Sequence, residues 1–157
     1  MKRSGEPRTK TIAENRRARH IYFLDRELEA GLVLTGTEVK SLRAGLASLD
    51  QAYAGEREGE LYLFNAYIGE YAQGNRANHA PRRERKILLH RRELGKWLDA
   101  VRRDGMTIAP LRLYFNQRGV AKLLLALARG KKLRDRRQTE KDRDWSRRRA
   151  RLLRERG

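Results

Sequence analysis

Cysteine is absent from the 157 residues, and the chain has only three prolines, three histidines and two methionines. Without cysteine there are no disulfide bridges and no thiolate ligands for zinc. His20, His79 and His90 do not form the His-x-x-x-His pair of a zinc helix, and no P-loop, nucleophile elbow or dinucleotide fingerprint occurs. We therefore expect no metal, no cofactor and no enzymatic activity.

Long apolar runs are missing as well. No stretch approaches the roughly 20 residues of a membrane-spanning helix, and the N-terminus lacks the apolar core of a secretion signal, so we expect a cytoplasmic protein. Acidic residues are outnumbered, since 20 Asp and Glu stand against 38 Lys and Arg, a formal net charge of +18. Nucleic acid and an anionic membrane surface are the two partners that such an excess suggests.

The positive charge is concentrated in three places. Residues 1–19 carry seven basic and two acidic side chains, and residues 129–157 carry fourteen basic and five acidic ones. The stretch 82–92 adds six basic side chains against the single acid Glu84, whereas the rest of the middle of the chain is slightly acidic. This clustering favours phosphate contacts over a merely solvated surface.

The middle of the chain has the pattern of a small β domain. A short helix is expected from a Thr37 cap to Gly45, and the clearest helix follows residue 90 and ends at Gly105. These helices flank short strands, which predicts a mainly β fold built as a small antiparallel barrel. Strands are expected over residues 22–34, 48–54, 60–68, 86–89, 108–115 and 120–128, with turns at 55–59 and 116–119.

Three regions follow from this pattern: a flexible basic arm (residues 1–14), a barrel domain (15–130) and a basic tail (131–157). The tail has good helix formers, but its length and excess charge make an isolated helix marginal in water. We expect it to be disordered alone and helical on a polyanionic surface. Trp145, which lies among arginines, suggests a stacking or docking partner there.

Aromatic side chains offer surfaces on which bases can stack, although aromatics in strands more often belong to a core. We therefore expect Tyr62 and Phe64 in the core. Tyr71 stands at the entrance of a loop over residues 69–84, and there RNA contact is the favoured interpretation.

Specific strings then narrow the function. The string GTEVKSLR (36–43) resembles a signature of the SsrA-binding protein family, SmpB, the partner of transfer-messenger RNA. The resemblance covers roughly residues 12–145, because further strings match in order. These strings are NRRARH (15–20), EAG (29–31), GN (74–75) with NH (78–79) and Pro81, RKILLH (85–90) and GKK (130–132).

The resemblance implies an oligonucleotide-binding (OB) type of barrel that binds the tRNA-like domain of transfer-messenger RNA. It also implies delivery of that RNA to stalled ribosomes in trans-translation, with the protein in place of the missing anticodon arm and the tail in the empty messenger channel. The implied partners are the small ribosomal subunit with its 16S rRNA decoding centre, and elongation factor Tu and alanyl-tRNA synthetase through the RNA.

By position, the resemblance assigns a set of RNA contacts in the barrel domain. Tyr71 is added to this set because it stands at the entrance of the loop. Glu29 can accept hydrogen bonds from base amino groups or 2′-hydroxyls. For Glu38, a helix-capping role or an ion pair with Lys40 or Arg43 is an equal alternative. The assigned residues are Asn15, Glu29, Glu38, Lys40, Arg43, Asn78, Arg83, Lys86 and Leu89.

In the tail, the resemblance places contacts with the decoding site and the messenger channel. Arg134 stands where many relatives carry histidine or an aromatic residue, and a guanidinium plane can also stack on a base. The tail residues are Lys131, Lys132, Arg134, Asp135, Arg136 and Arg137, to which we add Trp145. Two other functions remain as alternatives: a structural ribosomal protein, and an RNA-cleaving or RNA-modifying enzyme that uses the loop around His79.

Overall fold

Three long strands form the middle of one large sheet: β2 (Tyr22–Leu32), β8 (Thr107–Phe115) and β9 (Ala121–Gly130). They belong to a computed structural model that describes the backbone of residues 9–73, 78–130 and 133–155, and the side chains in these ranges except those of 133–140 and 155. Strands β8 and β9 form a hairpin, and β9 pairs with β2 from Tyr22 opposite Gly130 to Gly31 opposite Lys122.

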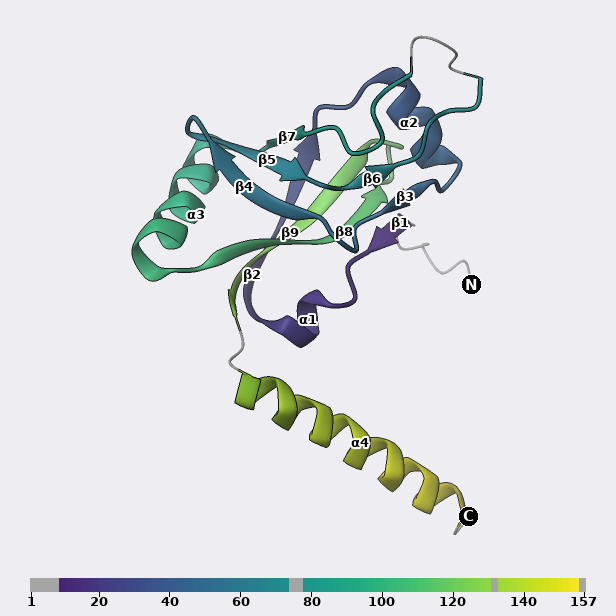
Figure 1. Ribbon diagram of the computed structural model, residues 1–157, viewed down its shortest axis with the longest axis vertical. Coiled ribbons are helices and arrows are strands. Elements are labelled where there is room, and N and C mark those ends of the chain that lie inside the picture. The colour runs from purple at the N-terminus through teal and green to yellow at the C-terminus, as the bar shows by residue number, and fades with distance from the viewer. Residues whose placement is uncertain (1–8, 74–77, 131–132, 156–157) are drawn as a thin grey trace, which may run out of the picture.

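The remaining strands extend this sheet on both sides. The order is β1-β8-β9-β2-β7-β5-β4, and every neighbouring pair is antiparallel. The sheet curls until β4 lies against β8, but the described residues form no hydrogen-bonded ladder there. The mainly β, OB-type prediction is therefore confirmed, in an incompletely closed form (Figure 1). The added strands are β1 (Lys10–Glu14), β4 (Tyr53–Arg57), β5 (Glu60–Phe64) and β7 (Arg85–Leu88), with β3 (Ala47–Ser48) and β6 (Tyr67–Ile68) as a separate pair.

Strand alternation fills the barrel with aliphatic side chains. Leu61 and Leu63 of β5, Ile87 of β7 and Leu123 and Leu125 of β9 are almost completely buried in one cluster. Tyr62 and Phe64 lie on the other face of β5 and are only half-buried, so their expected place in the core is wrong. Residues two apart share one face of a strand, and the leucines take the inner one.

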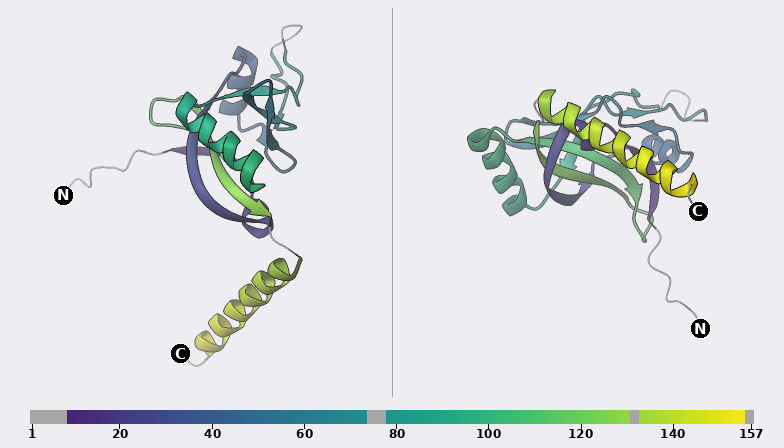
Figure 2. Two further views of the ribbon diagram at one scale, coloured as in Figure 1. Left: turned by 90° about the vertical axis from the view of Figure 1, so that its left-hand side faces the viewer. Right: turned by 90° about the horizontal axis from the view of Figure 1, so that it is seen from below.

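Within the described ranges, four helices accompany the sheet: α1 (Ala18–Ile21), α2 (Gly36–Arg43), α3 (Arg91–Asp104) and α4 (Leu133–Glu155). α3 lies against one end of the barrel, where it buries Trp97 and Leu98, and it ends at Gly105, as predicted (Figure 1). In Figure 1 and in the left view of Figure 2, α4 extends away from the barrel, and it comes close to α1. No described helix is both long and apolar enough to cross a membrane.

Several expected boundaries differ from the structure. Thr35, not Thr37, caps α2, because its hydroxyl accepts the Glu38 amide in a capping box. The turn expected over 55–59 shortens to Glu58 and Gly59, both with positive φ, so β4 continues to Arg57. Asn65, also at positive φ, interrupts the strand expected over 60–68, and a turn at 50–51 interrupts the one expected over 48–54.

The N-terminal arm is shorter than expected. Lys10–Glu14 form β1, which pairs with β8, and α1 follows directly, so residues 10–14 belong to the barrel domain. The small side chains of Ala109, Ala126 and Ala128 let Ala18 of α1 pack closely on the outer face of β8 and β9. Residues 1–8 lie outside the described residues.

Candidate nucleic-acid interface

Glu38 lies in the first turn of α2 with a side chain that is 0% exposed. Its carboxylate accepts the Thr35 amide (2.9 Å), and it pairs with Arg83 (2.5 Å) and with Arg85. The capping alternative is therefore the correct one, and the cationic partners are Arg83 and Arg85 instead of Lys40 or Arg43. Because burial leaves no surface for RNA, Glu38 supports the interface from beneath it.

Burial on its own would raise the pKa of Glu38. The hydrogen bonds from Arg83, the Thr35 backbone and Arg85, together with the charge of Arg85, outweigh that effect and hold the pKa below its usual value. The carboxylate is thus ionised at neutral pH, as its two cationic partners require.

Arg83 and Arg85 are turned toward the protein. Arg85 is fully buried and donates to the carbonyls of Ala66 (2.8 Å) and Pro81 (3.1 Å), so this member of the basic stretch does not face solvent. Arg83 is about one third exposed, and one of its Nη atoms donates to the Val33 carbonyl (3.2 Å) as well as to Glu38. Its Nε atom is buried, and the other Nη atom donates to the Glu84 carbonyl (3.4 Å), so any RNA contact by Arg83 uses that second Nη atom.

One cluster of predicted residues lies at α2, where Lys40 of the helix is close to Tyr71, which is in turn bonded to Asn78. The Lys40 ammonium lies 5.4 Å from the centre of the Tyr71 ring. The Asn78 side chain accepts the Tyr71 amide (3.0 Å) and donates to the Tyr71 carbonyl (2.7 Å), so it holds the backbone from which the ring emerges. Arg43 is exposed in the last turn of the same helix. The structure thus brings together three predicted residues: a cation, an aromatic ring and the amide that hydrogen-bonds to the backbone of that aromatic residue.

Glu29 and Leu89 line a second part of the surface, a cavity of about 360 Å³ between β2 and the β7–α3 junction. The buried hydroxyl of Tyr114 on β8 donates to the exposed Glu29 carboxylate. Burial and this hydrogen bond raise the pKa of Tyr114 well above its usual value, so the hydroxyl remains a donor. Tyr114 was not expected to take part in the site, and its partner is 85 positions away, so no local signal indicated it.

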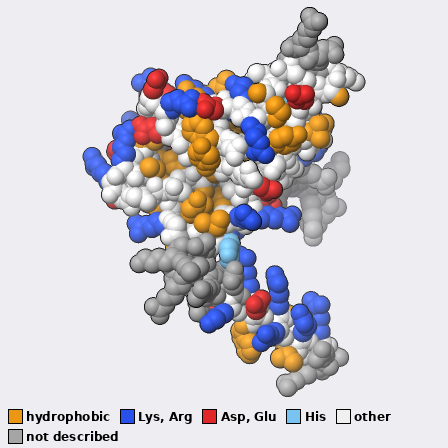
Figure 3. Space-filling model, in the orientation of Figure 1, with side chains coloured by type: hydrophobic (Ala, Val, Ile, Leu, Met, Phe, Trp, Pro, Cys, Tyr) orange, Lys and Arg blue, Asp and Glu red, His pale blue; other side chains and the backbone are white. Residues whose placement is uncertain are grey.

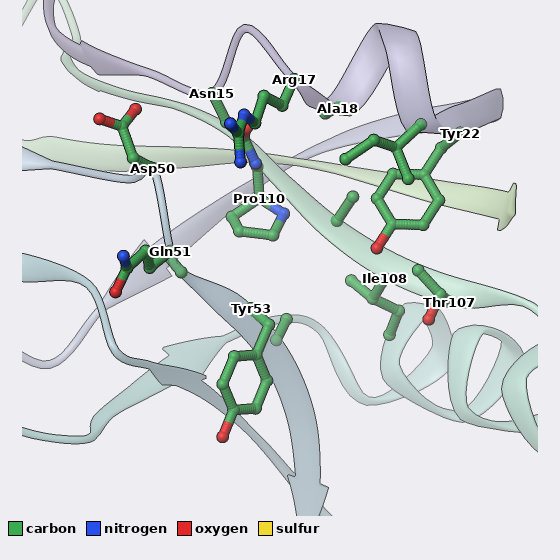
Figure 4. Close-up of a pocket in the computed structure, with 14 residues that line it drawn as sticks. Asn15, Arg17, Ala18, Tyr22, Asp50, Gln51, Tyr53, Thr107, Ile108 and Pro110 are labelled. Carbon is green, nitrogen blue, oxygen red and sulfur yellow. The ribbon is translucent and has the colours of Figure 1, made fainter. Parts of the chain in front are cut away.

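Asn15 lines a third part, a cavity of about 290 Å³ along the open seam between β4 and β8. Its side chain donates to the Pro110 carbonyl (3.0 Å), which holds α1 to the sheet. Figure 4 shows Asn15 and Arg17 on one side of this cavity and Tyr53 on the other. Lys86 lies on the outer face of β7, 3.8 Å from Glu60. The predicted barrel residues therefore form separate clusters instead of one pocket.

His79, on which the alternative of an RNA-cleaving or RNA-modifying enzyme depends, has a structural role. The His79 side chain is buried, with Nδ1 2.8 Å from the Thr37 hydroxyl and Nε2 2.9 Å from the Ile68 carbonyl. A carbonyl can only accept, so Nε2 carries a proton, and in the neutral imidazole Nδ1 then accepts from Thr37. With both nitrogens engaged inside the protein, His79 joins α2 to β6 and does not support RNA cleavage.

The structure describes only some of the predicted tail residues. Lys131 and Lys132 lie outside the described residues, and Arg134, Asp135, Arg136 and Arg137 are placed by backbone alone, in the first turns of α4. Trp145 is 62% exposed, and Leu152, two turns further on, is 52% exposed on the same side of the helix. In Figure 3, hydrophobic side chains are visible along one edge of α4, with Lys and Arg side chains beside them.

Comparison with known proteins finds a family model and relatives that match nearly the whole chain. A family model described as SmpB protein matches residues 12–155. An "SsrA-binding protein" of Mesorhizobium japonicum is 58% identical over 155 residues, which cover 99% of this chain and 98% of that one. An "SsrA-binding protein" of Brucella canis is 60% identical over 156 residues, 99% of each chain.

A solved structure also matches. It is described as "tmRNA-SmpB: a journey to the center of the bacterial ribosome", and one of its chains aligns with a TM-score of 0.62 and 55% sequence identity. The alignment covers 76% of this chain and 84% of that chain.

Proposed function

We propose, since the chain belongs to the SmpB protein family, that it binds the tRNA-like domain of transfer-messenger RNA (SsrA RNA) and delivers it to stalled ribosomes for trans-translation. The observation that carries this proposal is the 55–60% identity to SsrA-binding proteins along nearly the whole chain. The net charge of +18 supports it, because neutralising phosphates releases counterions and strengthens RNA binding.

In this proposal the barrel domain occupies the place of the missing anticodon arm. Its contacts come from the clusters around Lys40 and Tyr71, around Glu29 and Leu89, and around Asn15. The cations bind phosphates, whereas Glu29, held by Tyr114, accepts from base amino groups or 2′-hydroxyls. RNA recognised by shape is expected to meet several separate clusters, because an A-form helix is read along its surface.

The tail is proposed to act on the ribosome. α4 carries exposed Trp145, Leu152 and Leu153 among many cations, and this combination fits an RNA-lined channel. The residues from Lys131 to Arg137 would contact the decoding centre of 16S rRNA. A tail that is disordered alone and helical in the vacant messenger channel senses vacancy, because messenger RNA in the channel excludes it. Elongation factor Tu and alanyl-tRNA synthetase are proposed partners through the RNA, in the cytoplasm.

The test compares the affinity of the full chain for two RNAs. The dissociation constants for the isolated tRNA-like domain of transfer-messenger RNA and for bulk tRNA are measured in the same salt. We expect clear preference for the tRNA-like domain. Equal affinity for both RNAs would overturn the proposal and leave general RNA binding, as in a structural ribosomal protein.

A further inference from the structure

Planar side chains are gathered on the outer face of β4 and β5. The Tyr53 ring stacks on Phe64 with centroids 5.2 Å apart and an interplanar angle of 25°. Tyr62 lies on β5 two residues before Phe64, and the centroids of these two rings are 6.2 Å apart. In Figure 3, hydrophobic side chains are visible on this side of the barrel. Tyr53 is 57% exposed, so its ring is not part of the core and one side of it is open to solvent.

Arg57 extends this planar surface. Its guanidinium lies 5.6 Å from the Tyr62 centroid and 5.3 Å from the Phe64 centroid, and the side chain is 49% exposed. Both Nη atoms donate to the Glu84 carboxylate, which fixes the arginine above the rings. The result is a row of flat groups held in place before any ligand arrives.

Gly55 makes the arrangement possible. It lies opposite Tyr62 in the β4–β5 ladder, and a Cβ atom there would come within 3.0 Å of the Phe64 ring. Any other residue would force the ring to move. The glycine in the middle of β4 thus lets Phe64 lie across the neighbouring strand and support Tyr53.

The charges around the rings do not favour phosphate. Glu84 pairs with Arg57, Glu56 with Arg102, and Glu60 lies 3.8 Å from Lys86. These acids balance the nearby cations, so the surface offers flat apolar faces without an excess of positive charge. Such a surface fits the face of a nucleobase, which is uncharged, better than it fits the RNA backbone.

The position of the rings favours RNA over a protein partner. Tyr62 is the cross-strand neighbour of Lys86, and Tyr53 lines the same cavity as Asn15 (Figure 4). Asn15 belongs to one of the clusters of the proposed function, and Lys86 is an RNA contact that the family resemblance assigns. The aromatic surface therefore lies between two residues that are expected to contact RNA.

We propose that the Tyr53–Phe64 stack, flanked by Arg57, is the stacking site for an unpaired base of the bound RNA. This inference rests on the proposed function and adds a residue that touches a base. The contact is apolar and planar, so it contributes affinity that salt does not screen.

The test compares binding of the tRNA-like domain by the wild-type chain, Tyr53→Ala, Tyr53→Phe and the control Tyr67→Ala at several salt concentrations. Tyr67 is a matched control, because it is another exposed strand tyrosine beneath an arginine, Arg82. We expect Tyr53→Ala to bind about 5- to 150-fold more weakly with an unchanged slope of log affinity against log salt. Tyr53→Phe and Tyr67→Ala should bind like the wild type.

Unchanged affinity of Tyr53→Ala would overturn the inference, and weaker binding with a shallower salt slope would indicate a phosphate contact instead. Ultraviolet crosslinking of the wild-type complex should join RNA to the peptide that contains Tyr53. Loss of ribosome binding by Tyr53→Ala with full affinity for the tRNA-like domain would assign the surface to a contact with the ribosome and overturn the inference. If the wild-type chain does not prefer the tRNA-like domain over bulk tRNA, the proposed function itself fails.

Gly55→Ala is a second variant that keeps every aromatic ring. It should also weaken RNA binding, because the new Cβ crowds the Phe64 ring at 3.0 Å and shifts it against Tyr53. Thermal unfolding of both variants should show the cooperative transition of the wild type, which separates loss of the stack from loss of the fold.

Discussion

Glu38, Arg83 and Arg85 form the most heavily buried charged group among the described residues. Glu38 and Arg85 are both 0% exposed, and Arg83 is the link to solvent. Since Glu38 belongs to α2 and Arg85 to β7, their ion pair joins the helix that carries Lys40 and Arg43 to the sheet. One buried carboxylate therefore determines where several surface cations lie.

Glu38→Gln is expected to lower the free energy of unfolding by about 3–5 kcal/mol, because it leaves the buried Arg85 charge without its anion. Urea denaturation measures this change. Glu60→Gln is the control, since Glu60 and Lys86 form an exposed pair 3.8 Å apart, and its effect should stay below about 1 kcal/mol. Similar losses in both variants would contradict the structural role of Glu38.

The lowered pKa of Glu38 makes this contribution dependent on pH. A carboxyl whose pKa is lower in the folded state stabilises the fold above its unfolded pKa of about 4.3. That stabilisation is lost as the pH falls through the folded value. The difference in unfolding free energy between the wild type and Glu38→Gln should therefore shrink as the pH is lowered from about 5 to about 3. A constant difference over this range would argue against the ionised pair.

Among the elements, α3 has a local signal at its end. Gly105 takes the left-handed conformation, with φ of 63°, and its amide returns to the Ala100 carbonyl. Gly95 lies within the same helix, exposed, and no atom lies near the place of an added Cβ. The two glycines therefore differ in purpose: one ends the helix, and the other only weakens it.

Alanine at these two positions should change stability in opposite directions. Gly105→Ala should lower the free energy of unfolding by about 1–2 kcal/mol, because an L side chain is strained at positive φ. Gly95→Ala should raise it by about 0.5–1 kcal/mol through helix propensity. Chemical denaturation of both variants measures the difference, and changes of the same sign would contradict this account of α3.

At the scale of the whole molecule, half of the net charge of +18 lies in the C-terminal extension, residues 129–157. Residues 129–157 hold fourteen basic and five acidic side chains, and α4 extends away from the barrel (Figure 1). A helix that places Trp145 and Leu153 in water gains little from packing. The tail is therefore a separate functional part in the proposed function.

Deletion of residues 131–157 should leave the affinity for the tRNA-like domain nearly intact and abolish tagging on stalled ribosomes. The physical reason is that the proposed RNA contacts of the barrel do not include α4. A filter-binding assay measures the first property, and a reconstituted trans-translation reaction measures the second. Parallel loss of both properties would refute this division of labour.

The sequence predicted the elements whose signals are local. The apolar face and final glycine of α3, the β8–β9 hairpin and the basic tail all depend on residues within a few positions of one another. The family also followed from the sequence, because its strings occur in order, and the family model and the relatives confirm it.

Only the tertiary structure decided which faces and partners these residues use. Arg85 lies inside and Lys86 outside, Tyr62 and Phe64 lie on the outer face of β5, and Glu29 receives its hydrogen bond from Tyr114. A strand of alternating residues has the same local pattern whichever face is buried, and the choice comes from packing against strands far away in the chain. Local chemistry therefore determined the elements and the charge, while long-range packing determined the surface that they present.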